Sequence, residues 1–397
     1  MDDEFLEETS LDEELDDLTH QGSWADGAVL WSTDWTAETV VSQLKRGSID
    51  LNPNFQRRSA WNDKRQSLFI ESLILGLPIP QMILAEDKKK KGSFIVIDGK
   101  QRLLAILRFS AGAAGANEVE SLKSIEPLKL SGLKERADLN GKNLQDITVD
   151  AGLVDNLSAF ENSSIRTAVI RNWRSESYLY EVFLRINTGS VQLSPQELRQ
   201  ALIPGPFSNF IDEASADSEQ LQSALGLKKP DFRMRDAELL LRFIAYKTRA
   251  EKYRGNLKLF LDDTSKYFTI HWLNQKDFLK NLVLEMEEAF AFTRHIFGEK
   301  QYLSKWNGQD YEKRKNRAIF DIMLYYFSDP NIREASKNHL AEIEQNFRNL
   351  CEGNDKFLSS IESTTKSLEA NNDRFNIWAS TLEQIIDTKV PRIKFEV

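Results

Sequence analysis

The chain has 397 residues, of which 41% are hydrophobic and 28% charged, and its formal net charge is −9. These fractions are typical of globular proteins, and no stretch approaches the ~20 apolar residues that span a bilayer, so the composition excludes membrane-spanning and wholly disordered proteins. The length predicts two domains, while the single Cys351 and an acidic start without an apolar leader predict a cytoplasmic protein.

Residues 1–28 are expected to form a disordered acidic tail. Ten of the first twenty side chains are Asp or Glu, and none is Lys or Arg. A block of like charge is typical of a solvated segment, and the alternative is an acidic mimic that occupies a basic groove or a partner's surface. Overall acidity does not exclude nucleic acid as a partner, because binding depends on local patches.

Two helices with capping signals follow. Thr36 can cap a helix that ends at Gly47 and places Val40, Val41 and Leu44 on one face. The segment 51–61, LNPNFQRRSAW, predicts an irregular connection. Asn62 or Asp63 then caps a second helix that ends at Gly76. Its residues expected to face the core are Leu68, Phe69, Leu73 and Ile74.

Two strands and a hairpin tip come next. The sequence IPQMILAE predicts one strand, and the apolar run Phe94 to Asp98 predicts another. Between them Lys88 to Lys91 and Gly92 predict a solvated hairpin tip, with contact to a phosphate as the alternative.

The candidate chemistry lies at the turn after the second strand. Gly99 precedes a predicted helix, KQRLLAILRF, so the backbone can approach a ligand and the free N–H groups of the first helical turn can bind an anion. Arg102 can add a planar charged fork, and Asp98 can accept a hydrogen bond, hold a metal or position a water. The alternative is an ordinary tight turn with a surface arginine.

The rest of the first domain combines loop, strand and helix. Residues 110–164 predict an elaborated loop with at most a short helix over 133–139, and IRTAVIR predicts a strand. A helix opening at Ser175 ends in INTGS, where Arg185 and Asn187 either cap the helix or face a site. The next helix begins with a capping box in LSPQEL, in which Ser194, Pro195 and Glu197 occupy the N-cap, N1 and N3 positions.

From Phe207 to Val397 the pattern predicts one helix after another. The expected core aromatics are Phe290, Phe292, Phe297, Phe320, Tyr325 and Phe327. Two apolar stripes predict packing within a bundle, with an exposed docking face as the alternative. They are Leu340, Ile343, Phe347 and Leu350, and then Phe375, Trp378, Leu382 and Ile385.

A basic cluster near Trp306 and Tyr311 is expected to be a solvated helix face, with nucleic-acid contact as the alternative. Its members are Lys313, Arg314, Lys315 and Arg317. The fold class is therefore α+β, with a small mixed sheet and helices over 29–205 and an all-α domain over 206–397.

Four motifs in order resemble a known family. LNPNFQRRSAW, ESLILGLPIPQMIL, FIVIDGKQRLLAILRF and YEVFLRINTGSVQLSPQELRQAL resemble the ParB/sulfiredoxin-like domain in its GmrSD N-terminal branch, which also begins SspE-type defence proteins. The likeness spans roughly residues 29 to 261. An HNH nuclease often follows in that branch, but His271, His295 and His339 are scattered, so we expect no such domain here and a separately encoded effector instead.

The resemblance implies a nucleotide-binding module. Relatives bind or hydrolyse nucleoside triphosphates through a G-x-x-R turn, which here is Gly99, Lys100, Gln101 and Arg102. The branch usually shows DGQQR, so Lys100 replaces a glutamine and adds a charge suited to phosphate. By the same carry-over Gln56 and Arg57 should face the pocket, and Arg185 with Asn187 should close its other side.

The expected function is that of an NTPase in antiphage or restriction-type defence. Asp98 and Arg102 would be catalytic, the ligand would be ATP, GTP or CTP with Mg²⁺, and no membrane would take part. The alternatives are a non-catalytic nucleotide- or DNA-binding switch and a domain that nicks DNA itself. DNA and a second copy of the chain are further candidate partners.

Overall fold

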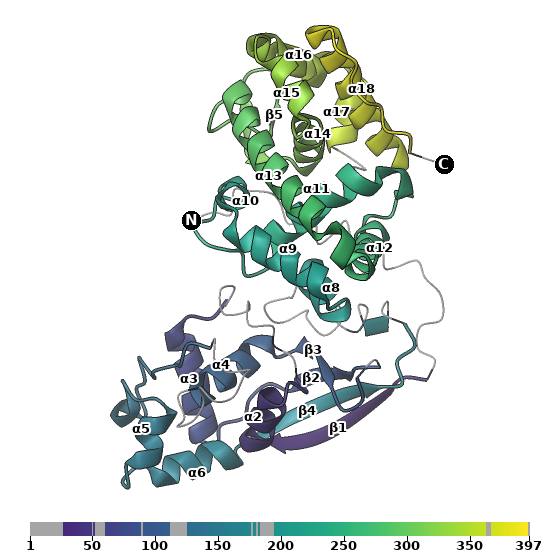
Figure 1. Ribbon diagram of the computed structural model, residues 1–397. Coiled ribbons are helices and arrows are strands. Elements are labelled where there is room, and N and C mark those ends of the chain that lie inside the picture. Colours follow the sequence, from purple (N-terminus) through teal and green to yellow (C-terminus); the bar gives the residue numbers. More distant parts are fainter. Residues whose placement is uncertain are drawn as a thin grey trace. The chain divides into compact units, whose positions relative to one another are not determined.

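The computed structural model describes residues 27–49, 51, 60–88, 90–111, 125–175, 178–179, 182, 194–362 and 367–395. Its contacts divide these residues into two compact units, one within residues 21–193 and one within 194–397. In Figure 1 the first unit combines a sheet with helices, and the second consists mainly of helices. The predicted α+β class is confirmed.

The sheet of the first unit is small and mixed. Its order is β1-β4-β2-β3, where β1 and β3 are the edges. Strand β4 runs antiparallel to β1 and parallel to β2, and β3 runs antiparallel to β2. The strands are β1 (Val29–Thr36), β2 (Met82–Glu86), β3 (Phe94–Asp98) and β4 (Ser164–Arg171). The start of β1 and the ends of β2 and β4 therefore lie at one end of the sheet, and Asp98 lies at the other.

Helices cover this sheet with the capping expected from the sequence. The Thr36 side chain accepts a hydrogen bond from Thr39 N at 3.1 Å, and that of Asn62 accepts one from Arg65 N at 2.9 Å. These bonds satisfy donors that a helix start leaves unpaired. The helices of this unit are α2 (Ala37–Lys45), α3 (Asp63–Ile74), α4 (Lys100–Ser110), α5 (Leu144–Val149) and α6 (Val154–Asn162).

Two expectations for this unit are wrong. Leu68 is 40% exposed, whereas its neighbours Gln66 and Ser67 are fully buried. Gln66 Nε2 donates to Trp61 O at 3.1 Å, and Ser67 Oγ accepts from Ser131 N at 3.0 Å, so this face of α3 packs through polar bonds. The predicted loop over 110–164 contains α5 and α6. The first has only six residues and the second buries only Asn156 and Phe160, so neither shows an apolar helical stripe.

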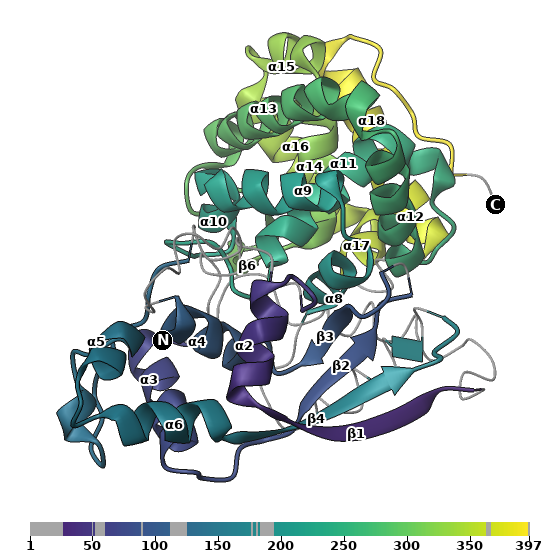
Figure 2. The same cartoon turned by 60° about the horizontal axis from the view of Figure 1, so that its bottom comes forward.

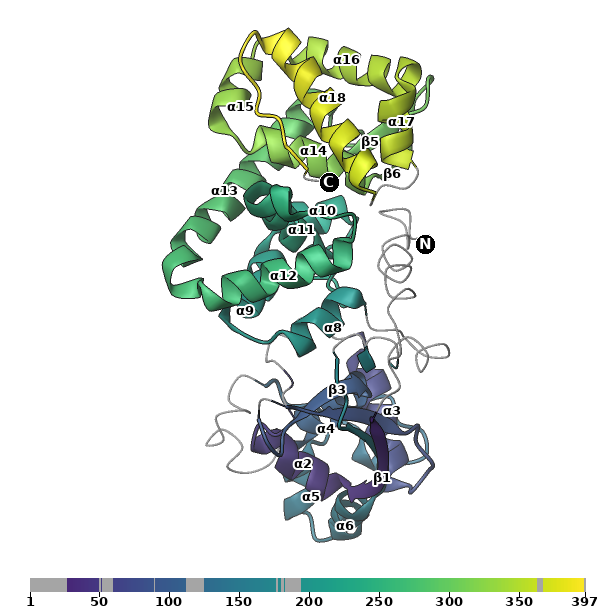
Figure 3. The ribbon, with the colours of Figure 1, turned by 90° about the vertical axis from the view of Figure 1, so that its right-hand side faces the viewer.

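The second unit is helical except for one hairpin among its described residues. The Ser194 capping box is confirmed, because Ser194 Oγ accepts from Glu197 N and Ser194 N donates to the Glu197 carboxylate. Figure 3 shows the helices from the side. They are α8 (Pro195–Leu202), α9 (Pro206–Asp217), α10 (Glu219–Ala224), α11 (Arg235–Arg249), α12 (Leu257–Ile270), α13 (Trp272–Phe297), α14 (Arg317–Phe327), α15 (Pro330–Ser336), α16 (Leu340–Gly353), α17 (Asp355–Glu362) and α18 (Leu368–Ile386).

The predicted aromatics and stripes pack inside this unit. Phe290, Phe320 and Phe327 are buried, and Phe292 and Tyr325 pack at the margin of the same core. Both stripes likewise lie in or against this core, on α16 and α18. Packing within the bundle is therefore confirmed over a docking face.

The basic cluster is not a helix face, contrary to expectation. It lies mainly on the hairpin of β5 (Ser304–Trp306) and β6 (Tyr311–Lys315). Lys313 and Arg314 are exposed on β6, but Lys315 is buried and its Nζ donates to Tyr302 O at 2.6 Å. Burial, together with Arg294, lowers the pKa of Lys315 to about 8.

Candidate functional site

The candidate site is the turn that leads from β3 into α4. Gly99 has a φ of +105°, in the left-handed region that favours glycine. A Cβ at this position would lie 3.0 Å from Met82 Cγ, so β2 also leaves little room for a side chain. Both the dihedral angle and the approach of β2 therefore require a glycine at the turn.

The N-terminus of α4 is electrically suited to an anion. No side chain caps it at Gly99, and its first turn contains no acidic residue but contains Lys100 and Arg102. Unpaired N–H groups and the helix dipole give a helix start a partial positive charge. Lys100 is 9% exposed, so its stem is packed against the fold. Positive charge at this turn therefore comes from backbone and side chains together.

Arg102 holds the two sides of the turn together. Its Nη2 donates to Asp98 Oδ2 at 2.7 Å, across the glycine. Its Nη1 donates to Pro80 O and to Gln81 O, the latter at 3.2 Å, just before β2 begins. The guanidinium is nearly buried, whereas the Asp98 side chain remains 22% exposed. Arg102 therefore fixes the Asp98 carboxylate in place, and none of the described residues bonds to Asp98 Oδ1.

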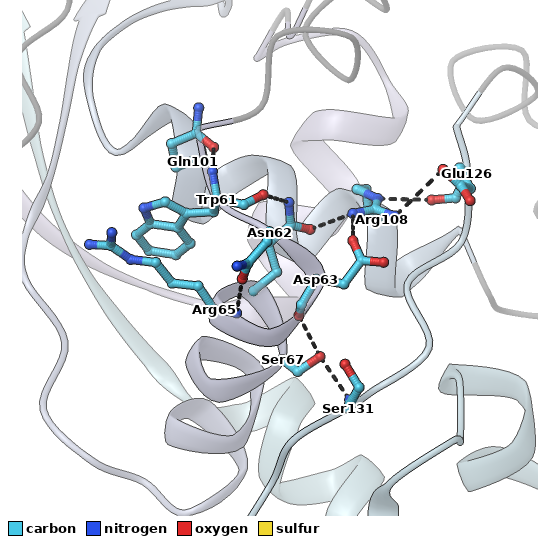
Figure 4. Close-up of polar contacts among 10 residues, drawn as sticks. Trp61, Asn62, Asp63, Arg65, Ser67, Gln101, Arg108, Glu126 and Ser131 are labelled. Atoms are coloured by element: carbon cyan, nitrogen blue, oxygen red, sulfur yellow. Dashed lines mark hydrogen bonds and ion pairs between the residues drawn. The ribbon is translucent and has the colours of Figure 1, made fainter. Parts of the chain in front are cut away.

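Gln101 connects the turn to the start of α3. Trp61 N donates to Gln101 Oε1 at 3.3 Å, although 40 residues separate the two. The guanidinium of Arg65 lies 4.8 Å from the centre of the Trp61 ring, and Figure 4 shows the two side chains side by side below Gln101. The middle of the G-x-x-R turn thus contacts the end of the aromatic, arginine-rich segment that the sequence assigned to the same site.

Behind this contact lies a polar cluster that the sequence did not predict. Arg108 Nη1 donates to Asp63 Oδ1 at 2.6 Å and to Gln66 Oε1 at 3.0 Å, and Arg108 Nε donates to Glu126 O at 3.1 Å (Figure 4). Arg108 is 7% exposed. The sequence carried no signal for it beyond its place in the helix that follows the DGKQR motif, one turn after Leu104. The cluster joins α3, α4 and the segment at residue 126, so it supports the site from behind.

Four predicted site residues cannot be placed. Gln56, Arg57, Arg185 and Asn187 lie outside the described residues. The structure brings together Asp98, Gly99, Lys100, Gln101 and Arg102 as consecutive residues of one turn. Their roles toward a nucleotide stay predictions.

The helical unit contains two buried ion networks that serve the fold. Asp321 accepts from Arg242 Nε at 2.6 Å and from Arg374 Nη2 at 3.2 Å, and thereby joins α14, α11 and α18. The side chains of all three are at most 2% exposed. Charges buried this deeply are paired because an isolated buried ion is costly.

The second network joins α8 to α12. Asp262 Oδ1 accepts from Arg199 Nε at 2.6 Å, and Asp262 Oδ2 accepts from Lys258 Nζ at 2.8 Å. Burial alone would raise the pKa of Asp262, but the charges of Arg199 and Lys258 outweigh it, and the pKa lies below its ordinary value. Both networks fix the packing of helices within the second unit.

Within the described ranges, no group of three or more His, Cys, Asp or Glu side chains is arranged to hold a metal ion. None of the helices in the described parts of the chain is both long and apolar enough to cross a membrane.

Comparison with known proteins gives one family. Residues 37–204 match the family described as GmrSD restriction endonuclease, N-terminal domain. No family of HNH nucleases matches the remainder. No curated protein and no solved structure matches the chain. The matched range contains the strand–turn–helix site and the Ser194 capping box, and the family name indicates a role in restriction or defence.

Proposed function

From the premise that residues 37–204 form a domain of the GmrSD N-terminal family, we propose that this chain binds a nucleoside triphosphate at the turn between β3 and α4 and hydrolyses it. It would do so as the nucleotide-dependent module of a restriction-type defence system. The observation that carries the proposal is the geometry at Gly99. A glycine required on two grounds leads into a helix start that has no side-chain cap and whose first turn contains Lys100 and Arg102 but no acidic residue.

The contacts at the turn suggest a role for each of its residues in nucleotide binding. The first-turn amides and Lys100 would bind phosphate oxygens, because both present positive charge at the helix start. Arg102 is engaged by Asp98 and by the carbonyls of Pro80 and Gln81, so it acts first as a positioning residue. A ligand phosphate could compete with Asp98 for its Nη2. Through its hydrogen bond with Trp61 N, Gln101 would link the turn that binds the nucleotide to the start of α3.

Asp98 is the candidate to orient the attacking water or to hold Mg²⁺. Arg102 fixes its Oδ2, and this bond thereby sets the direction of the second carboxylate oxygen, Oδ1. A single carboxylate fits Mg²⁺, since this ion is commonly bound by one or two carboxylates together with substrate phosphates and water. When bound, Mg²⁺ would neutralise charge on the phosphates. The water oxygen would attack the γ-phosphorus, and the bond to the β-phosphate oxygen would break to release the diphosphate and inorganic phosphate.

A separately encoded effector, a nuclease or a toxin, would read the nucleotide state. Two alternatives use the same turn. In one, nucleotide or DNA binds without hydrolysis and only sets the conformation of the domain. The ion pair of Arg102 with Asp98 favours this alternative, because an incoming phosphate could replace Asp98 as the partner of the guanidinium. In the other, the domain itself nicks DNA.

The test is phosphate release from ATP, GTP and CTP with Mg²⁺, with and without DNA, together with nicking of supercoiled plasmid. Asp98→Asn keeps the shape of the side chain and should abolish release while nucleotide still raises the melting temperature. Arg102→Ala should abolish both. Asp138→Asn serves as the matched control, because Asp138 also pairs with an arginine but lies far from the turn in sequence.

Each outcome decides between the readings. Release that Asp98→Asn removes and Asp138→Asn retains supports hydrolysis at this turn. Nucleotide-dependent stabilisation without release favours the binding switch, and plasmid nicking lost with Asp98→Asn favours the nuclease. Absence of both stabilisation and release with all three nucleotides would reject the proposed site.

A further inference from the structure

Cations gather at the end of the small sheet that lies opposite Asp98. The start of β1, the ends of β2 and β4 and the β2–β3 hairpin tip meet here (Figure 2), and the loop after α2 joins them at β3. The described residues of these segments include seven cations but only two acids, Glu86 and Asp87. The cations, which we call the basic surface, are Lys45, Arg46, Lys88, Lys90, Lys91, Arg171 and Arg174.

Hydrogen bonds bring the segments of the basic surface together. Lys88 Nζ donates to Arg174 O at 3.0 Å and lies 3.9 Å from the centre of the Trp173 ring. Lys90 Nζ donates to Gly47 O at 3.2 Å. The hairpin tip is thereby bonded both to the segment after β4 and to the loop after α2, so three separate segments present positive charge on one surface.

The charge of this surface is not neutralised within the described parts of the chain. Elsewhere in the same unit, Arg102, Arg108 and Arg136 each pair with a carboxylate. A cluster of like charge without counter-charges attracts a polyanion. Six cations of the basic surface form no ion pair with a described residue, namely Arg46, Lys88, Lys90, Lys91, Arg171 and Arg174.

The chain itself carries a polyanion next to this surface. Residues 1–20, which lie outside the described residues, contain ten Asp or Glu and no Lys or Arg. Asp17 precedes Gly27 by ten residues, a span of at most about 36 Å. A Cβ on Gly27 would lie 3.7 Å from Arg174 Nε, so the described chain begins beside the basic surface. Attachment through so short a linker gives an effective concentration of about a millimolar.

Apolar side chains next to the basic surface favour a peptide over a nucleic acid. Val29, Leu30 and Trp31 at the start of β1 are 49%, 64% and 54% exposed. Bases can stack on a tryptophan, but a nucleic-acid backbone has no aliphatic groups to cover Val29 and Leu30. The acidic segment intersperses its carboxylates with apolar residues, which are Phe5, Leu6, Leu11, Leu15 and Leu18.

We propose that residues 1–20 bind to the basic surface of their own chain, where they cover the start of β1 and keep other polyanions away. The contact goes beyond the proposed nucleotide site, because Asp98 lies at the other end of the sheet. It is mainly electrostatic, so salt should weaken it and a competing polyanion should displace it.

The experiment is cleavage of the full chain by a glutamate-specific protease, with loss of the N-terminal peptides followed by mass spectrometry. Residues 1–20 contain five glutamates, and their cleavage rate reports the fraction of chains in which this segment is unbound. The surface variant replaces three exposed cations, Arg46→Gln, Lys91→Gln and Arg174→Gln. At about 0.01 M salt it should lose these peptides about tenfold faster than the wild type, and at about 1 M salt the two rates should agree.

A matched control removes the same charge elsewhere in the unit. Lys64→Gln, Lys129→Gln and Lys134→Gln also replace three exposed cations, and this variant should be cleaved at the wild-type rate.

A second variant tests the contact from the side of the acidic segment without touching the folded unit. Replacing the five aspartates of residues 1–20 by asparagine keeps every glutamate at which the protease cleaves. It should also accelerate cleavage of the otherwise wild-type chain. In the surface variant the same replacement should add little, because the contact is already lost.

Three outcomes would overturn the proposal. The first is equal cleavage of the wild type and the surface variant at low salt; if the surface variant then also loses affinity for duplex DNA, the basic surface binds nucleic acid instead. The second is an aspartate replacement that accelerates cleavage equally in both backgrounds. The third is wild-type protection that grows with protein concentration, which would place the contact between two chains.

Discussion

Two arginine–aspartate pairs show how differently the two units use the same ionic bond. Arg102 and Asp98 are four residues apart, and the Asp98 side chain is 22% exposed. Arg242 and Asp321 are 79 residues apart, and their side chains are 2% and 0% exposed. The local pair borders solvent, where we propose that a phosphate replaces one partner, whereas the distant pair holds helices together in the core.

The largest effect should follow from breaking the buried pair. Asp321→Asn leaves the Arg242 and Arg374 guanidinium groups in the core without their carboxylate, so the free energy of unfolding should fall by about 3–5 kcal/mol. Urea denaturation followed by circular dichroism measures it. The exposed pair of Arg136 and Asp138 supplies the control, and Asp138→Asn should cost less than about 1 kcal/mol. Equal losses would show that burial does not distinguish the two kinds of pair.

The second network should make stability sensitive to acid. Burial opposes the charge on Asp262, but Arg199 and Lys258 outweigh it, so its folded pKa lies below 3.8. The unfolded state then binds more protons as the pH falls below about 4, and stability is lost in that window and fully present above it. Asp262→Asn should lower the free energy of unfolding by about 3 kcal/mol at pH 7. Its stability should also depend less on pH below about 4. Melting temperatures of both proteins between pH 3 and pH 7 check this, and parallel curves would contradict it.

Substitution of Gly99 should reduce both stability and nucleotide binding, because it changes the backbone conformation of the turn. Gly99→Ala forces a side chain into the left-handed region and toward Met82, so we expect a loss of about 1–3 kcal/mol together with loss of nucleotide binding. Gly141 also has a positive φ, +81°, but nothing lies within 4 Å of an added Cβ. Gly141→Ala should therefore cost only about 1 kcal/mol and leave nucleotide binding intact. Thermal shift with and without nucleotide measures both, and equal effects would remove the special role of the turn.

The smallest effect on stability should come from the charge at the helix start. Lys100→Gln replaces the charge by the amide that the resemblance predicts at this position, and it should change stability by less than about 1 kcal/mol. Nucleotide affinity should fall by about five- to tenfold, because one positive charge near the phosphates is lost. Isothermal titration calorimetry measures it, with the exposed Lys134→Gln as the matched control. Unchanged affinity would assign phosphate binding to the backbone alone.

The contrast between the two units also explains what the sequence could predict. Helix starts at Thr36, Asn62 and Ser194 were predicted because a cap and its helix lie within four residues of each other. The strand–turn–helix site was predicted for the same reason. Its linkage to Trp61 and the Arg108 cluster were not, since their partners lie 18 to 45 residues away in the sequence.

Where the predictions failed, packing overrode the local pattern. Leu68 belongs to an apolar stripe, yet the polar bonds of Gln66 and Ser67 turn the helix so that it faces solvent. The basic run in β6 was predicted to lie on a helix face because the pattern assigned all of residues 207–397 to helices. The Asp321 network joins three separate helices, and periodicity within one helix carries no information about it.

The strand order of the small sheet also determines how long β1 remains without its partner strand while the chain is being synthesised. Val29 pairs with Arg171, about 140 residues later, so β1 leaves the ribosome well before its only partner among the described strands. At about 5–20 residues per second, β1 waits roughly 7–28 s without its partner strand. The hairpin of β2 and β3 can close within the first 98 residues. A nascent chain thus passes through a defined interval in which an unpaired apolar strand is available to chaperones or to neighbouring chains on the same polysome.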